Sequence, residues 1–288
     1  MITRLARAER LNFLLTNCIP RRGVGRCVGW ISHSENPVVR AVSLWTWRRF
    51  TEIELDDAER TRFRSMHDCF TRRLRPGARL VDPDPAVLTS PCDGIVGAFG
   101  TVMAGRALQV KGMDYPLSEL LDDAEHAASL EGGSFVTLRL TSAMYHRFHA
   151  PHDCRVEAVR HVFGDCWNVN PPTLRRVSRL FCRNERVVIR TVLSEHGVPL
   201  TLVAVAAILV SGIRLGFLPL ETKGRLPLRR GYRCDAALAR GAEMGWFEHG
   251  STIIVLAPKE LALTGALREG ERIRMGQPLL RFRDPRAG

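Results

Sequence analysis

A succession of short apolar runs rich in β-branched residues begins near residue 87, and it constrains the fold of this chain more than any other feature. Runs of this length, bounded by glycine, proline and charged residues, are typical of β-strands. They lie at 87–89, 95–99, 107–110, 135–140, 156–163, 187–192 and 200–210. The last and longest run is well below the roughly 18 to 20 residues of a membrane-spanning helix, so we interpret it as a buried strand.

Helical signals are concentrated at the front of the chain. Between residues 52 and 75 apolar side chains recur at helical spacing, which predicts one packed helix that ends at Pro76-Gly77. Those side chains are Phe63, Met66, Phe70 and Leu74. A second, short helix is predicted at 117–121. We therefore expect an α+β, mostly β protein, with a basic helical region at 1–75 followed by a β-rich domain at 76–288.

The C-terminal part alternates glycine turns with strand-like segments between Gly270 and Leu279. This pattern resembles the hairpins of biotinyl/lipoyl barrel-sandwich domains, so we expect a barrel-sandwich-like C-terminal part. No lysine stands at the tip of the turn to carry a prosthetic group. The pattern therefore gives little support to a carrier domain.

The first 50 residues hold nine arginines against two glutamates, a net charge of +7 out of +12 for the chain. They also hold three of the five tryptophans, Trp30, Trp45 and Trp47. Helices that mix arginine, tryptophan and leucine suit the headgroup layer of an anionic membrane. A helical flap packed on the body is the alternative, and nucleic acid is disfavoured because no nucleic-acid-binding motif accompanies the charge.

The eight cysteines are scattered, with no C-x-x-C pair and no short framework. This spacing argues against a zinc ribbon and against a disulfide-stapled secreted domain, and it favours reduced thiols in a cytosolic compartment. No secretory signal is evident, because charged residues interrupt the first apolar stretch. We therefore predict a peripheral location on the cytoplasmic face of the cell membrane.

Gly250-Ser251-Thr252 leads directly into the β-branched run that begins at Ile253. If Ser251 Oγ attacks the carbonyl of Gly250, the amide becomes an ester, and glycine gives the backbone the freedom to bend. Elimination then leaves a ketone, a pyruvoyl group, at the new chain start. Such a ketone can form a Schiff base with an amine and act as an electron sink. Taken alone, however, Gly-Ser-Thr before an apolar run is typical of a turn entering a strand.

Two further stretches carry the residues that a self-processing serine needs. Asp93 lies in a Pro/Gly-framed turn, and His146 and His149 precede a proline turn. Asp93, His149 and Ser251 could form an orienting acid, a base and a nucleophile. An aspartate in such a turn is usually a turn former, and a metal site at His146, His149 and His152 lacks a carboxylate or thiolate at ligand spacing. We therefore predict no metal.

The order of five stretches resembles the phosphatidylserine decarboxylases of the bacterial membrane-associated type. The stretches are 90–94 (SPCDG), 109–121 (QVKG and YPLSELL), 145–151 (YHRFHAP), 180–187 (LFCRNERV) and 241–252 (GAEMGWFEHGST). The resemblance covers about residues 65 to 280. Two departures are visible: Cys92 stands where the family more often has a small aliphatic residue, and His249 where leucine or glycine is common.

The resemblance implies that the proenzyme cuts itself between Gly250 and Ser251 into a β chain of residues 1–250 and an α chain of residues 251–288. Asp93 and His149 would assist the cut, and Ser251 would become the pyruvoyl cofactor that forms the Schiff base with substrate. His146 would lie near the substrate. The implied activity converts phosphatidylserine to phosphatidylethanolamine in phospholipid biosynthesis. The implied partners are this anionic lipid, a membrane surface and the two chains themselves, and a homodimer is compatible with this interpretation.

Two other functions compete with this interpretation. A serine hydrolase could use Asp93, His149 and Ser251 in an intact chain, but no G-x-S-x-G elbow exists. A non-enzymatic barrel-sandwich carrier or lipid-binding module is weakened by the missing lysine and by the two histidines.

Overall fold

The computed structural model describes residues 21–51, 53–207, 212–219, 230–248 and 251–283. Its helices are α3 (Arg21–His33), α4 (Pro37–Phe50), α5 (Met66–Phe70), α6 (Leu117–Leu121), α7 (Ala124–Ser129), α8 (Pro171–Leu174) and α9 (Leu180–Arg183). Its strands are β1 (Val87–Thr89), β2 (Gly94–Thr101), β3 (Arg106–Val110), β4 (Met113–Pro116), β5 (Ser134–Leu140), β6 (Arg147–His149), β7 (Cys154–Val162), β8 (Arg186–Leu193), β9 (Pro199–Ala206), β10 (Ile213–Leu215), β11 (Arg230–Leu238), β12 (Glu243–Phe247), β13 (Ser251–Ala257), β14 (Leu261–Leu263), β15 (Arg272–Ile273) and β16 (Pro278–Phe282).

An eight-stranded antiparallel sheet forms the centre of the body, in the order β11-β7-β8-β9-β13-β5-β2-β15. Strand β13 lies between β9 and β5, and Ser251 is level with Ala206 on one side and Leu140 on the other. Every residue of β13 is buried. The strand that starts at Ser251 is therefore held by ladder hydrogen bonds on both edges.

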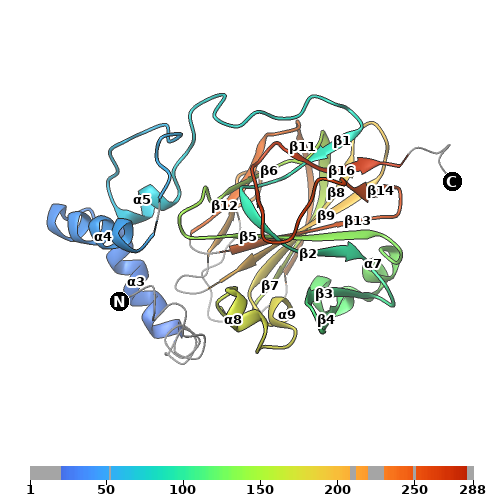
Figure 1. The fold of residues 1–288 in the computed structure, drawn as a ribbon, viewed down its shortest axis with the longest axis horizontal. Helices are drawn as coiled ribbons and strands as arrows, with labels where there is room; N and C mark the ends of the chain where they lie inside the picture. The colour runs from blue at the N-terminus through green and yellow to red at the C-terminus, as the bar shows by residue number, and fades with distance from the viewer. Residues whose placement is uncertain (1–20, 52, 208–211, 220–229, 249–250, 284–288) are drawn as a thin grey trace.

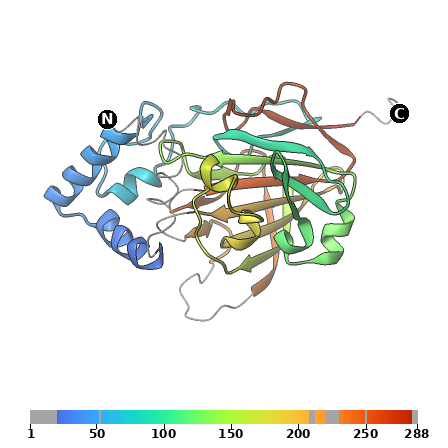
Figure 2. The ribbon, with the colours of Figure 1, turned by 60° about the horizontal axis from the view of Figure 1, so that its bottom comes forward.

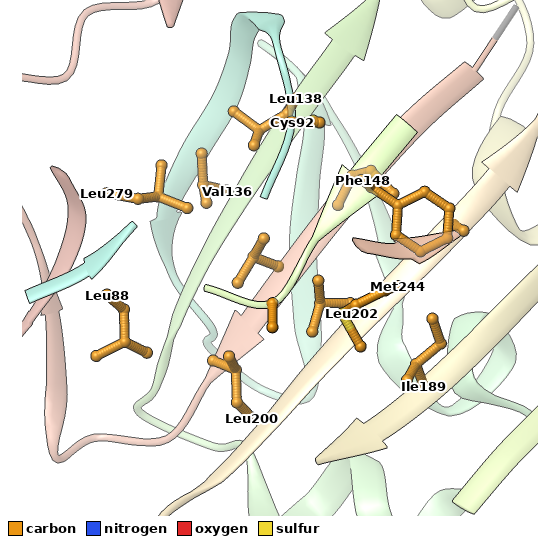
Figure 3. Packing of buried hydrophobic residues seen from close by; sticks show 14 of the residues in the cluster. Leu88, Cys92, Val136, Leu138, Phe148, Ile189, Leu200, Leu202, Met244 and Leu279 are labelled. Carbon is orange, nitrogen blue, oxygen red and sulfur yellow. The ribbon is translucent and has the colours of Figure 1, made fainter. Parts of the chain in front are cut away.

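Apolar side chains cover both faces of this sheet, which explains why its inner strands are almost continuously hydrophobic. On one face, Ile253 and Val255 join a large cluster that also contains residues of β1, β6, β12 and β16 (Figure 3). On the other face, Ile254 and Leu256 pack with residues of α6, α7, α9 and the β3–β4 hairpin (Figure 1). The mostly β fold with a few helices is confirmed, and none of the described sheets closes into a barrel.

Helices α3, α4 and α5 lie together at one side of the β body (Figures 1 and 2). The side chain of Asn36 caps α4 by accepting hydrogen bonds from Val38 N and Val39 N, and Pro37 begins the helix. Leu44 and Trp47 of α4 pack against a small cluster that contains Phe63 and Cys69. The front of the described chain is thus helical, as expected, and residues 1–20 lie outside the described part.

The single helix expected between residues 52 and 75 is wrong over most of its length, because only Met66–Phe70 is helical there. Backbone pairing between two parts of this segment replaces the helix. Glu59 N donates to Arg73 O and Arg75 N to Asp57 O, beside a bridge between Ala58 and Leu74. Long-range pairing therefore overrides the helical spacing of the apolar residues.

The expected strands and the helix at 117–121 are found in place, except that residues 208–210 of the longest run lie outside the described residues. In the C-terminal part, β15 pairs with β2 while β16 lies between β1 and β14, so these two strands join different sheets instead of forming one hairpin. Gly276, at φ +90°, brings its Cα so close to Leu80 that an added Cβ would meet Leu80 O at 2.3 Å. Only glycine therefore fits at position 276 of the predicted turn.

Among the described helices, none has the length and apolar character needed to cross a membrane.

Candidate active site

Ser251 lies where the chain passes from one sheet to another. Strand β12 pairs with β10 and β6 as far as Phe247, and β13 then begins in the large sheet at Ser251. The predicted cleavage bond falls in the short connection between the two sheets. His249 and Gly250 themselves lie outside the described residues. Glu248, the residue before them, is anchored by its N–H to Gly212 O and by its carboxylate to Arg214.

The hydroxyl of Ser251 is fully buried and has no hydrogen-bond partner among the described residues. A buried hydroxyl without a partner lowers the free energy of unfolding by about 1–3 kcal/mol. A functional role would explain why the fold keeps it there. Ser251 shares the sheet face of Ile253 and Val255, because side chains alternate along a strand. Its Oγ is thus a buried nucleophile candidate at the entrance of a tightly held strand.

Asp93 lies at the same end of the sheet as Ser251. It immediately precedes β2, whose Ile95 is level with Arg139 of β5, next to the Leu140 that faces Ser251. Two strand spacings therefore separate the rows of Asp93 and Ser251, about 10 Å.

Two groups that no sequence motif indicates hold the carboxylate of Asp93. Arg79 donates to it through Nε, at 2.9 Å from Oδ1, and through Nη2, at 2.6 Å from Oδ2. Met275 N also donates to Oδ1 at 2.9 Å. Arg79 is itself buried and contacts Asp57 with its other terminal nitrogen, at 2.6 Å. The carboxylate, held by Arg79 and Met275 N, is therefore fixed in position before any chemistry begins.

His149 is positioned by its backbone and by both ring nitrogens. His149 N donates to Pro91 O at 2.7 Å, which brings the histidine against the turn that carries Asp93. Nδ1 lies 2.9 Å from Gly241 O, and Nε2 lies 3.0 Å from the hydroxyl of Tyr145. Since a carbonyl can only accept, Nδ1 carries the proton and Nε2 accepts from Tyr145. The lone pair that could act as a base is thus at Nε2, where it accepts from the Tyr145 hydroxyl.

Burial lowers the pKa of His149, although the hydrogen bond to Gly241 O and the charges of Glu243 and Asp93 act in the opposite direction. The ring is therefore neutral at neutral pH, which is the form that can accept a proton. The structure shows no hydrogen bond between Asp93 and His149, because Arg79 and Gly241 occupy the positions where one would form. The charge of Asp93 is one of the influences that raise the pKa of His149.

His146 is fully buried beneath helix α5. Its ring lies against that of Phe70 at a tilt of 33°, with centroids 3.8 Å apart, and Nδ1 lies 2.8 Å from Met144 O. The carbonyl of His146 accepts from Phe247 N at 2.9 Å, which ties it to the strand that leads to the cleavage bond. The structure therefore places Asp93, His146, His149 and Ser251 toward one end of the sheet, while their roles remain predictions.

Cys92, one of the two departures from the family pattern, is fully buried beside Leu138 and behaves as a small apolar residue (Figure 3). Burial raises the pKa of its thiol well above the usual value. His152, the third residue of the metal alternative, contacts Pro85 O through Nε2 at 3.0 Å. In the described part of the chain, no group of histidine, cysteine and acidic side chains is arranged to hold a metal ion.

Comparison with known proteins shows which family this chain resembles. The sequence model of the phosphatidylserine decarboxylase family matches residues 66–281. A phosphatidylserine decarboxylase proenzyme from Anaeromyxobacter sp. (strain K) is 37% identical over 278 residues, covering 94% of this chain and 98% of the relative. A protein of the same name from Xanthomonas euvesicatoria pv. vesicatoria is 35% identical over 274 residues, covering 93% and 97%.

Proposed function

The chain belongs to the phosphatidylserine decarboxylase family, and we propose that it acts through a pyruvoyl group made from its own Ser251. Decarboxylation of phosphatidylserine, which gives phosphatidylethanolamine, follows from the family itself. The observation that carries the proposal is the buried Ser251 Oγ, which lacks a described partner and lies at the junction of two sheets. The proenzyme name of the relatives is consistent with a chain that must be processed.

In the proposed cut, His149 Nε2 takes the proton of Ser251 Oγ as the oxygen attacks the carbonyl carbon of Gly250. For this step Nε2 has to exchange its contact with the Tyr145 hydroxyl for one with Ser251. The C–N bond of the peptide breaks, and the amine of residue 251 takes a proton to give an ester intermediate. Elimination then releases the Gly250 carboxylate, and hydrolysis of the resulting dehydroalanine releases ammonia.

The residues that remain fit the resulting group. Position 251 is enclosed on both sides by β5 and β9, so the group would be shielded from water. When present, a pyruvoyl ketone supplies a Schiff-base acceptor for the substrate amine and an electron sink for the loss of carbon dioxide. His146 is proposed to hold a proton near that reaction, because its ring is buried at the same end of the sheet.

Exchange of His146 for alanine should separate processing from turnover. We expect the His146→Ala protein to be cut between residues 250 and 251, since that step uses His149, but to convert phosphatidylserine at least about 100-fold more slowly, the usual minimum for loss of a proton-transfer group. The cut itself is the internal control for folding. The measurement is phosphatidylethanolamine formed in mixed micelles. Normal turnover by the processed variant would exclude the role of His146.

We also propose that α3 and α4 dock the enzyme on the cytoplasmic face of the membrane. The exposed side of α4 presents Val38, Val42 and Trp45 at helical spacing, while Trp30 on α3 is 77% exposed. Arg48 and Arg49 are exposed in the last turn of α4. Rings at the interface and guanidinium groups on lipid phosphates would then act together, each basic residue contributing about 1 kcal/mol.

Removing the two exposed tryptophans should weaken membrane binding. Burial of one large apolar side chain is worth about 1.5–3 kcal/mol, so Trp30→Ser with Trp45→Ser should reduce binding to anionic vesicles at least about tenfold. Met103→Ser is the matched control, because Met103 is equally exposed but lies on the β body. Vesicle sedimentation at low and high salt measures both contributions. Unchanged binding of the double variant would refute the docking surface.

A further inference from the structure

A cavity of about 170 Å³ opens over strands β7, β8 and β11, and three arginines line it: Arg160, Arg190 and Arg233. It lies on the sheet face that carries Val188 and Leu256, whereas Ser251 belongs to the opposite face. Along the sheet, the row through Arg190 and Thr201 reaches β13 at Leu256, five residues beyond Ser251. The cavity is therefore separate from the candidate active site, by roughly 17 Å along the strands alone.

The strand register places two of these arginines on either side of a small residue. Arg233 of β11 is level with Ala158 of β7, and Ala158 is level with Arg190 of β8. Residues directly opposite each other in a sheet point to the same face, so both side chains rise beside Ala158, with their Cα atoms roughly 10 Å apart. Gly231 adds to the hollow, since a Cβ placed there would meet nothing within 4 Å.

Arg160 already has an ion-pair partner, whereas the side chains of Arg190 and Arg233 do not. Arg160 donates to Asp122 O and lies 3.1 Å from Asp123 Oδ2, which fixes it at the rim. The side chains of Arg190 and Arg233 make no hydrogen bond or ion pair with any residue that the structure describes, although their backbones are paired in the sheet. Asp122 and Asp123 both pair with Arg160, so the two aspartates and three arginines leave one positive charge in excess, and the side chains of Arg190 and Arg233 carry no ion pair of their own.

His126 of α7 completes the lining without adding charge. Its Nε2 lies 2.8 Å from Thr201 Oγ1, and burial, followed by the charge of Arg190, lowers the pKa of the ring to about 4. The neutral imidazole thus leaves the positive charge of the arginines uncompensated. An anion placed between Arg190 and Arg233 would raise the pKa of His126 again, because it would offset the nearby positive charge.

We propose that this cavity binds a phosphate group, either as a free anion or as part of a lipid headgroup. Planar guanidinium groups bind phosphate oxygens in pairs, and two arginines that rise from the same sheet face on either side of Ala158 suit a doubly charged anion better than a carboxylate. The cavity is smaller than the roughly 300 Å³ of pockets for drug-sized ligands, so the ligand is no larger than a phosphorylated headgroup. The site is independent of the proposed pyruvoyl chemistry.

Titration of the purified full-length protein with inorganic phosphate and with glycerol phosphate tests this site. We expect saturable calorimetric binding at one site and an upward shift of the His126 pKa in NMR spectra. The Arg190→Ser, Arg233→Ser double variant should bind at least tenfold more weakly. Arg155→Ser is the matched control, since Arg155 is an exposed arginine of β7 that pairs with Asp235. Both variants should still be cut at 250–251.

A second arm distinguishes the two sources of phosphate. Vesicles of phosphatidylcholine with phosphatidylglycerol, which is anionic and lacks an amine, replace the soluble anions. If the double variant loses vesicle binding while wild type shows no affinity for soluble phosphates, the ligand is a lipid headgroup. If the double variant loses binding of soluble phosphate but still binds vesicles as wild type does, the ligand is a free anion. Equal binding of wild type and the double variant in both arms would overturn the site.

Discussion

Ser251→Ala protein should remain one uncut chain, whereas the wild-type protein should separate under denaturing conditions into chains of residues 1–250 and 251–288. The difference is expected because the hydroxyl of Ser251 is the only group at this position that can attack the preceding carbonyl. Intact-mass measurement checks both species without knowledge of the substrate. The short chain should lack a free amino terminus and should weigh less than its encoded peptide by the mass of one ammonia molecule.

The variant should fold as well as the wild-type precursor. Ser251 Oγ makes no hydrogen bond to a described residue, so its removal costs no interaction and relieves a buried, unpaired hydroxyl. Its melting temperature should therefore equal or exceed that of any uncut wild-type protein. Thr252→Val is the matched control, because Thr252 is the adjacent buried hydroxyl residue and its side chain points to the other face of the sheet. This control should still be cut.

The two chains should stay together in native conditions. Strand β13 pairs along its whole length with β5 and β9, while β15 and β16 pair with β2 and β1 of the longer chain. Gel filtration should thus show one species that contains both chains. Borohydride should abolish activity by reducing the ketone. If protein active on phosphatidylserine had the mass of a single 288-residue chain, the pyruvoyl proposal would be wrong and the hydrolase alternative would return.

The strands that sequence predicts well are those buried on both faces. Runs such as 134–140 and 199–206 are mostly apolar and contain several β-branched residues, because both surfaces of the large sheet are covered. Strand β6, at Arg147–His149, carries no such pattern, since its place depends on pairing with β12. The segment 53–64 was predicted incorrectly for the same reason: its structure comes from distant backbone partners and not from its own periodicity.

The candidate site shows a similar division. Its four predicted residues could be named because each stands in a motif whose order along the chain is distinctive. Arg79 and Tyr145 could not be assigned to the site, because only the fold reveals that they contact Asp93 and His149. Tyr145 does stand in the quoted 145–151 stretch, so a signal was present. Arg79 lies in a proline- and glycine-rich loop that gives no such signal.

Exchange of His149 for alanine should cause uncut precursor to accumulate, with cutting slowed by about 10²–10⁴-fold. A serine hydroxyl is a weak nucleophile without a base, and Nε2 of His149 is the lone pair that the structure provides at this end of the sheet. Because burial lowers the pKa of His149, cutting in the wild-type protein should persist below pH 6.5, where an exposed histidine is mostly protonated. Cutting should fail only when the pH drops through the lowered value. A His149→Ala protein that is cut at the normal rate would exclude the base.

Asp93→Asn tests whether Asp93 acts on His149 through its charge. Loss of that charge removes an influence that raises the pKa of His149, so the acidic limb of the cutting rate should move to still lower pH, and cutting at neutral pH should slow. A purely structural role would slow cutting equally at all pH values. Asp57→Asn is the matched control, because Asp57 is the other carboxylate on Arg79 and the Arg79–Asp93 pair survives its exchange. Identical pH profiles for the two variants would show that Asp93 only supports the fold around Arg79.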